Sequence, residues 1–163
     1  MILVLGSFTG IRIGISSVKA IAEAKKIKII AVNSLETLAY NTETSKEYIC
    51  SLIDARNNNA YSGLFDVNHN LVQDLSADSI DAILENLPNT HITFVGNATE
   101  IHKEKIIEKF GEKAVFSNTN SLSSAKLGLC AYNKIIKNEY ILPDELLPLY
   151  LRKSQAERML ENG

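Results

Sequence analysis

Near its start the chain carries the sequence GSFTG at residues 6–10, where glycines and hydroxyls stand just before an apolar repeat. A glycine-rich turn that leads into a helix can hold an anion, because free backbone N–H groups and the helix dipole both favour negative charge. The candidate anion-binding residues are Gly6, Ser7, Thr9 and Gly10, with Arg12 in the turn that follows. The spacing differs from a P-loop, which needs a lysine, and from a dinucleotide fingerprint. The alternative, which we favour, is a rigid strand-to-helix turn in which Thr9 caps the helix.

Two further polar pairs are secondary candidates for a binding contact. Asp54 and Arg56 alternate at the end of an expected strand, so their side chains should point the same way. We expect them to contact a partner or another domain, although a surface ion pair worth less than about 1 kcal/mol is the alternative. Tyr150 and Arg152 share one face of an extended segment. Arg152 could contact phosphates, but we expect this segment to be a tail laid across the second lobe.

Metal and thiol chemistry receive little support from the sequence. The three histidines, His69, His91 and His102, do not have the spacing of a zinc motif, so we reject a metalloprotease and expect solvated or capping side chains. Cys50 and Cys130 lie too far apart to form a zinc pattern, and we expect two small buried side chains in a reducing compartment. We expect no catalytic residue, no metal and no cofactor, ATP included.

Composition and charge exclude several classes of protein. The 163 residues are 45% hydrophobic and 22% charged, with a formal net charge of −2, which is ordinary for a globular protein. This charge gives no general electrostatic case for binding nucleic acid. No apolar run approaches the roughly twenty residues of a membrane span. We expect a soluble cytoplasmic protein.

The loop at residues 6–10 is followed by an expected helix over residues 11–25 with two apolar stripes. The helical spacing of 3.6 residues places one group on the larger stripe: Ile11, Ile15, Val18, Ile21 and Ala22. A second stripe of smaller residues contains Ile13, Ala20 and Ala24. A helix with two apolar stripes needs two surfaces to pack against. Either both lie within the chain, or one belongs to a partner.

The rest of the chain predicts an α/β fold. We expect strands at residues 2–5 and 27–33, a helix at 35–39 capped by Ser34, and an antiparallel meander of strands from 47 to 74. After the meander, strands at 91–97 and 113–117 alternate with helices at 79–86 and 99–110, and a long helix capped by Asn120 or Ser121 ends near 136. Polar residues between 41 and 47 suggest a hinge, so we expect lobes at 1–45 and 46–163.

Four motifs in this chain resemble the signature of the TsaB/YeaZ family. The segment GSFTGIRIGISSVKAIA resembles the family's glycine-rich loop and helix, and VNSLETLAYN resembles its Ser-Leu-Glu helix start. LIDARNNNAYSGLFD resembles its Asp-Ala-Arg hairpin, and PLYLRKSQAER resembles its C-terminal Tyr-Leu-Arg-Lys segment. The four occur in the family's order. The resemblance implies a two-lobed architecture like that of actin-like ATPases and RNase H (ASKHA), and we expect the first lobe to be N-terminally truncated.

The resemblance also implies a function. Family members are non-catalytic subunits of the machinery that makes threonylcarbamoyladenosine (t6A) in tRNA, and they bind and activate a catalytic paralogue, TsaD. A third subunit, the TsaE ATPase, docks where these two meet, and tRNA is contacted only through the complex. The residues expected to bind the partner are Ile11, Arg12, Ile15, Val18, Lys19 and Ala22. Two alternatives stay open: a phosphate- or nucleotide-binding enzyme that acts alone, and a homodimer or other self-associating scaffold.

Overall fold

The computed structural model describes residues 2–3, 8–42 and 47–151. By packing, the chain divides into two compact units, one formed by Met1–Ser34 with Ala131–Gly163 and the other by Leu35–Cys130. The mixture of helices and a five-stranded sheet confirms the predicted α/β class. The predicted lobes at 1–45 and 46–163 differ from these units and stay a prediction. None of the described helices combines the length and the apolar character that a membrane span needs.

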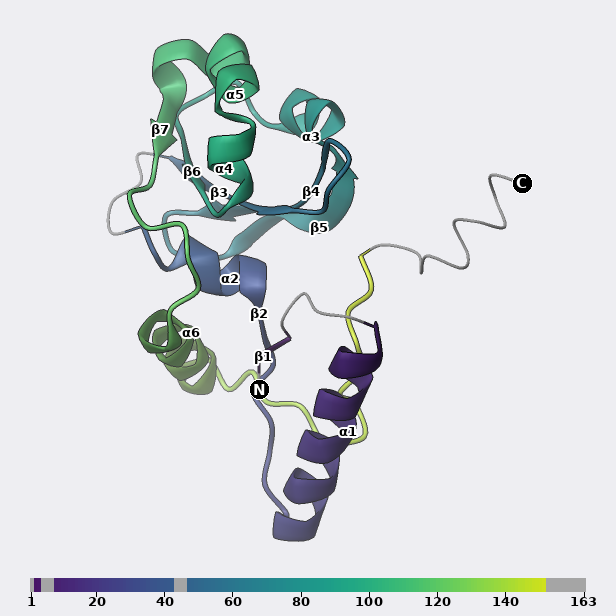
Figure 1. Cartoon of the computed structure of the whole chain (residues 1–163). Coiled ribbons are helices and arrows are strands. Elements are labelled where there is room, and N and C mark those ends of the chain that lie inside the picture. Colours follow the sequence, from purple (N-terminus) through teal and green to yellow (C-terminus); the bar gives the residue numbers. More distant parts are fainter. Residues whose placement is uncertain (1, 4–7, 43–46, 152–163) are drawn as a thin grey trace, which may run out of the picture. The chain divides into compact units, whose positions relative to one another are not determined.

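The unit Leu35–Cys130 is built on a sheet with the strand order β5-β4-β3-β6-β7 (Figure 1). The predicted meander is confirmed: β3 (Tyr48–Asp54), β4 (Asn59–Asp66) and β5 (Leu71–Ser79) are antiparallel neighbours. The strands β6 (Ile92–Val95) and β7 (Ala114–Phe116) run parallel to β3. The strand β5 continues to residue 79 rather than 74, because Ser79 still pairs with Asn59.

Three helices cover one face of this sheet: α3 (Ile80–Asn86), α4 (Ala98–Ile101) and α5 (Lys103–Phe110) (Figure 1). Their buried side chains pack with inward-facing residues of the strands in one core that includes Leu52, Ile80, Phe94 and Ile106. The short helix α2 (Ser34–Ala39) lies on the other face, where Leu38 approaches Gly96. The alternation of strands and helices after the meander agrees with the predicted α/β units.

Several predicted helix ends were wrong, for local reasons. Ser79, expected as the first residue of the helix at 79–86, instead caps α3, since its hydroxyl accepts the backbone N–H of Ala82. The helix predicted over 99–110 is two helices, because His102 leaves the helical backbone at φ −111°. Asn120 accepts the backbone N–H of Gly96. The next helix, α6 (Ser124–Ile136), therefore begins later than expected.

In the other unit the main element is α1 (Phe8–Lys25), one helix of 18 residues. The helix begins before Thr9, so Thr9 and Gly10 lie in its first turn. The prediction that both belong to a loop, with Thr9 as the cap of the following helix, was wrong. Gly6 and Ser7 lie outside the described residues. Two short strands, β1 (Ile2–Leu3) and β2 (Val32–Asn33), pair in parallel. The strand predicted at 27–33 is reduced to β2 and an antiparallel bridge between Ile29 and Ile141.

Candidate functional site: the two faces of helix α1

One face of α1 packs against its own chain. Ile15 and Ala22 are only 6% and 2% exposed, and Ile11 and Val18 are partly buried beside them. The residues that cover this stripe come from two segments: Ile29, Ala31, Ile141 and Leu146. Four of the five residues of the larger apolar stripe therefore pack within the chain, whereas the fifth, Ile21, is 60% exposed.

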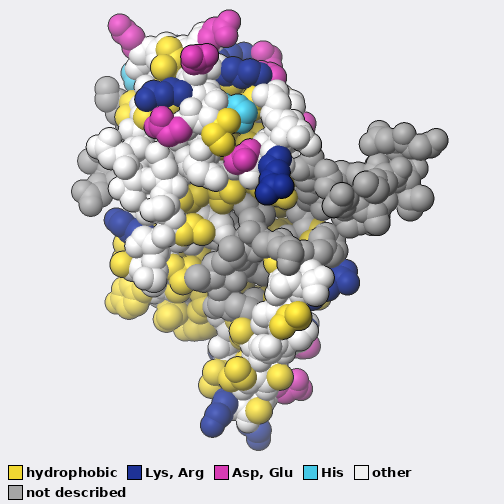
Figure 2. All heavy atoms as spheres, in the orientation of Figure 1, with side chains coloured by type: hydrophobic (Ala, Val, Ile, Leu, Met, Phe, Trp, Pro, Cys, Tyr) yellow, Lys and Arg dark blue, Asp and Glu magenta, His cyan; other side chains and the backbone are white. Residues whose placement is uncertain are grey.

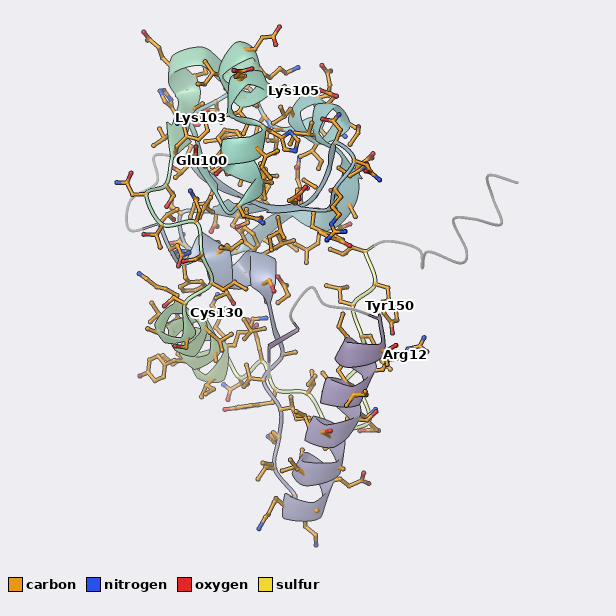
Figure 3. The ribbon with its side chains drawn as sticks, in the orientation of Figure 1. Arg12, Glu100, Lys103, Lys105, Cys130 and Tyr150 are labelled. Carbon is orange, nitrogen blue, oxygen red and sulfur yellow. The ribbon has the colours of Figure 1, made fainter. Side chains whose placement is uncertain are left out.

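The C-terminal segment, residues 141–150, runs along this face of α1 and is held there by polar contacts. Lys19 donates from Nζ to the backbone oxygens of Asp144 and Leu146, at 3.2 and 3.3 Å. Arg12 donates from Nε to the hydroxyl of Tyr150 at 2.9 Å, and its guanidinium lies 5.9 Å from the centre of that ring (Figure 3). The expectation of a tail across the second lobe was wrong, because apolar burial at Leu146 and two cationic donors direct the segment to α1.

The opposite face of α1 is exposed and carries apolar and small side chains. Ile13 and Ile21 are 62% and 60% exposed. The residues between and beside them on this face are all exposed and small: Gly10, Gly14, Ser17, Ala20 and Ala24. An ideal Cβ placed on Gly14 would meet nothing within 4 Å. We call this set, with Ile13 and Ile21, the exposed face of α1.

The exposed face of α1 has the character of a helix–helix contact. Two isoleucines supply apolar area, and small residues between them let another helix approach closely. The described part of the chain offers another exposed apolar helix face on α6, where Leu129, Tyr132 and Ile136 are 45%, 58% and 61% exposed. Figure 2 shows hydrophobic side chains gathered over α6 and along α1.

The residues expected to bind a partner therefore fall into two groups in the structure. Ile11, Ile15, Val18 and Ala22 contact the chain's own segments, and Arg12 and Lys19 bind the C-terminal segment. The exposed face is formed by the second stripe (Ile13, Ala20 and Ala24), which sequence reasoning noted but did not select, together with Ile21, which it assigned to the larger stripe.

The anion-binding interpretation gains nothing from the described residues of the loop. Thr9 and Gly10 are exposed in the first turn of α1. The Arg12 side chain, which would serve an anion there, donates to Tyr150 instead. The other two residues of that candidate site, Gly6 and Ser7, lie outside the described residues, as does Arg152.

Asp54 and Arg56 are close in the structure, but not through their side chains as predicted. The carboxylate of Asp54 accepts the backbone N–H of Arg56 at 2.9 Å, and Arg56 has a left-handed backbone with φ +62°. The backbone N–H of Asp54 donates to the side-chain oxygen of Asn97. Asp54 thus shapes the turn between β3 and β4, and among the described residues it forms no ion pair with Arg56.

Two of the three histidines are not solvated as predicted. His102 is 8% exposed at the junction of α4 and α5 and makes no capping hydrogen bond with its side chain. Burial lowers the pKa of His102, opposed by the nearby carboxylate of Asp54. His69 stacks on Tyr40, with ring centres 4.0 Å apart. Among the described residues no group of three or more histidine, cysteine or acidic side chains could hold a metal ion.

Both cysteines are buried, as predicted, and neither takes part in a disulfide. Cys50 is fully buried within the core of the Leu35–Cys130 unit, and burial raises the pKa of its thiol to about 12. A thiol that stays protonated is a poor nucleophile and a poor metal ligand. Cys50 therefore serves the core and not chemistry.

The fold defines an α/β protein of the actin-like class, and comparison with solved structures agrees. YeaZ from Pseudomonas aeruginosa superposes with a TM-score of 0.69 at 22% identity, over 89% of this chain and 70% of that one. A crystal structure of an uncharacterized protein with similarity to peptidase YEAZ, also from Pseudomonas aeruginosa, gives 0.68 at 23% identity, over 90% and 69%. These likenesses confirm the predicted fold class.

Sequence comparison identifies the family. Residues 6–160 match the family model described as "TsaD: tRNA N6-adenosine threonylcarbamoyltransferase". The tRNA threonylcarbamoyladenosine biosynthesis protein TsaB of Bacillus subtilis (strain 168) is 31% identical over an alignment of 159 positions that covers 93% of this chain and 68% of that protein. The chain belongs to the TsaB/YeaZ family.

Proposed function

We propose that this chain acts in the biosynthesis of threonylcarbamoyladenosine in tRNA, as a non-catalytic subunit that binds and activates a TsaD-like catalytic paralogue. The name of the Bacillus subtilis relative supports a role in this pathway. The matched family model is named after the transferase itself, so the division between catalytic and partner subunit is part of the proposal.

The exposed face of α1 carries this proposal. Ile13 and Ile21 are more than half exposed on a helix whose opposite face is already filled by the chain's own segments. Leaving two large aliphatic side chains in water is unfavourable, and burying each would contribute about 1.5–3 kcal/mol. The paralogue would cover this face with a helix of its own, and the small residues of α1 would allow close packing.

The C-terminal segment, which packs on the covered face of α1, also supports the proposal. Because Leu146 and the donors Arg12 and Lys19 hold the segment on the covered face, α1 keeps a fixed set of exposed residues. A surface that is organised before binding loses less conformational entropy when the partner arrives. Arg12 and Lys19 would therefore act on the partner through the segment that they position.

The proposal also includes the ATPase subunit and the tRNA. A TsaE-like ATPase would dock where this chain meets the paralogue, and tRNA would be contacted only through the complex, in the cytoplasm. The net charge of −2 agrees with indirect contact, because a chain that binds RNA directly usually carries a basic surface. No cofactor is assigned to this chain.

A reconstituted tRNA modification reaction tests the function. The paralogue, the ATPase and a source of the activated threonylcarbamoyl group are combined with unmodified tRNA, with and without this chain, and modified nucleoside is quantified by mass spectrometry. The proposal expects product only when the chain is present, and no product from the chain alone. Product in its absence, or turnover by the isolated chain, would contradict the proposal.

A homodimer through α1 is the competing occupant of the same surface. Analytical ultracentrifugation of the chain alone and with the paralogue separates the two. The proposal expects a heteromeric complex that forms at the expense of any homodimer. A homodimer that persists in the presence of excess paralogue would assign the exposed face of α1 to self-association instead.

A further inference from the structure

The strand β5 forms an open edge of the five-stranded sheet, far in sequence from α1. It stands last in the strand order, and no other described strand pairs with its outer side. It is also the longest strand, with nine residues, and Leu71 and Val72 at its start are 48% and 47% exposed. An open edge offers a row of unpaired backbone N–H and C=O groups to an incoming strand.

The side chains of β5 that face the helix layer are polar or acidic rather than apolar. Gln73 and Ser76 lie opposite Leu64 and Ser62, both of which face inward towards α3. Their polar atoms are already engaged, since Ser62 and Ser76 share a 2.7 Å hydrogen bond and Gln73 donates to Asn86 at 3.2 Å. The carboxylates of Asp74 and Asp78 on this strand are the candidate groups for binding another molecule.

A cavity of about 90 Å³ opens beneath this edge, between β5 and α3. Its lining includes Asp74 and Asp78 from β5, Ser62 from β4, and Ile83 and Asn86 from α3. The cavity suits the end of one extended basic side chain, with apolar contact along the stem and carboxylates near the charge.

The charges of β5 decide which kind of strand would fit. Between residues 71 and 79 the strand contains Asp74 and Asp78 and has no lysine or arginine. Asp74 takes part in no ion pair among the described residues, and the carboxylate of Asp78 accepts only the backbone N–H of Ser79 there. A second copy of β5 would bring four aspartates together, which is unfavourable. Basic residues opposite the two aspartates would be favourable.

We propose that β5 is a docking edge for an extended basic segment of another protein, which would pair as a sixth strand and place a lysine or arginine in the cavity beside Asp74 and Asp78. Backbone pairing would supply most of the affinity and the acidic cavity would supply the specificity, as in other cases of strand addition. The surface lies in the Leu35–Cys130 unit, so it is separate from the exposed face of α1.

A short peptide tests this docking edge. The two aspartates are four residues apart, about 13 Å along a strand, so the probe is acetyl-TKVTVKT-amide, with lysines at the same spacing. One control peptide replaces both lysines by glutamate, and a second replaces the central threonine by proline, which removes a ladder donor. Binding to the full chain is measured by calorimetry, and backbone amide shifts by NMR locate it.

The proposal expects the lysine peptide to bind at least about tenfold more tightly than either control, with shifts concentrated in β5. The variant Asp74→Asn/Asp78→Asn should lose that preference. The variant Glu139→Gln/Asp144→Asn, which makes the same change of charge at exposed residues of the other unit, should keep it. Equal binding of all three peptides, no binding, or shifts outside β5 would overturn the proposal. A homodimer through β5 would overturn it as well.

Discussion

The Arg12 Nε atom donates a 2.9 Å hydrogen bond to the Tyr150 hydroxyl, which joins α1 to a residue 138 positions later in the chain. This contact lies at the end of the C-terminal segment that begins at the bridge between Ile29 and Ile141. Between these two contacts the C-terminal segment covers one face of α1. The exposed face of α1 consists of the residues that this segment does not cover.

Removing the hydroxyl of Tyr150 should have a small effect on stability. Both partners are exposed, so we expect Tyr150→Phe to lower the free energy of unfolding by about 0.5–1 kcal/mol. In the double variant, Arg12→Ala should lower the free energy of unfolding little further, because the hydrogen bond is already lost. Urea unfolding measures both values. Tyr132→Phe, on the exposed face of α6, is the matched control and should change nothing. Additive losses from Arg12 and Tyr150 would show that they do not act as a pair.

Leu146 should contribute far more to stability than its neighbour. Leu146 is 1% exposed beneath α1, whereas Leu147 is 69% exposed. Leu146→Ala leaves a cavity and should lower the free energy of unfolding by about 2–5 kcal/mol. Leu147→Ala should change it by less than about 0.5 kcal/mol. Equal effects of the two variants would show that the C-terminal segment does not pack on α1 in solution.

Gly96 should not tolerate a side chain. It has φ +113°, and an added Cβ would stand 2.0 Å from the backbone oxygen of Leu52. Backbone strain alone costs about 1–3 kcal/mol, and the overlap adds to it, so Gly96→Ala should lower stability by at least about 3 kcal/mol. Gly128→Ala, in open space on α6, should raise stability by up to about 1 kcal/mol. A tolerated Gly96→Ala would contradict the described turn after β6.

His102 should make stability depend on pH. Because burial lowers its pKa in the folded chain below 6.5, the unfolded chain binds more protons in the range just below 6.5. The free energy of unfolding should therefore rise with pH in that range. Asp54 and Asp81 favour the charged form and Lys105 opposes it. His102→Gln should flatten this slope in urea unfolding from pH 5 to 7.5, and an unchanged slope in this variant would contradict the assignment to His102.

The sequence predicted most of the Leu35–Cys130 unit because its signals are local. Alternating apolar residues and turn residues such as the Asn57–Asn59 run define the meander, and Pro88 follows the end of α3. Helix ends were less predictable, since several residues could have capped each one. Asn120 is an example, because its side chain is used by Gly96, a residue 24 positions away.

The site was predicted only in part because burial depends on contacts between distant residues. Periodicity placed two apolar stripes on α1 but could not say which one the chain covers itself. Leu146 and Ile141 decide which stripe is covered, because both pack against α1. Ile141 is placed there by its bridge to Ile29, and residues so far apart in the chain give no local sequence signal of their pairing. Phe8 and Thr9 looked like a loop because glycines flank them, yet helical hydrogen bonding extends through them.

The most direct test of the central claim compares single isoleucine substitutions on two helices. Ile13→Glu changes the exposed face of α1, and Ile101→Glu changes an isoleucine of similar exposure, 60% against 62%, on α4. Binding of each purified variant to the TsaD-like paralogue is measured by calorimetry, with circular dichroism to check folding. The account predicts that Ile13→Glu weakens binding at least about tenfold while Ile101→Glu binds like the unaltered chain. Unchanged binding of Ile13→Glu, or equal losses in both variants, would contradict it.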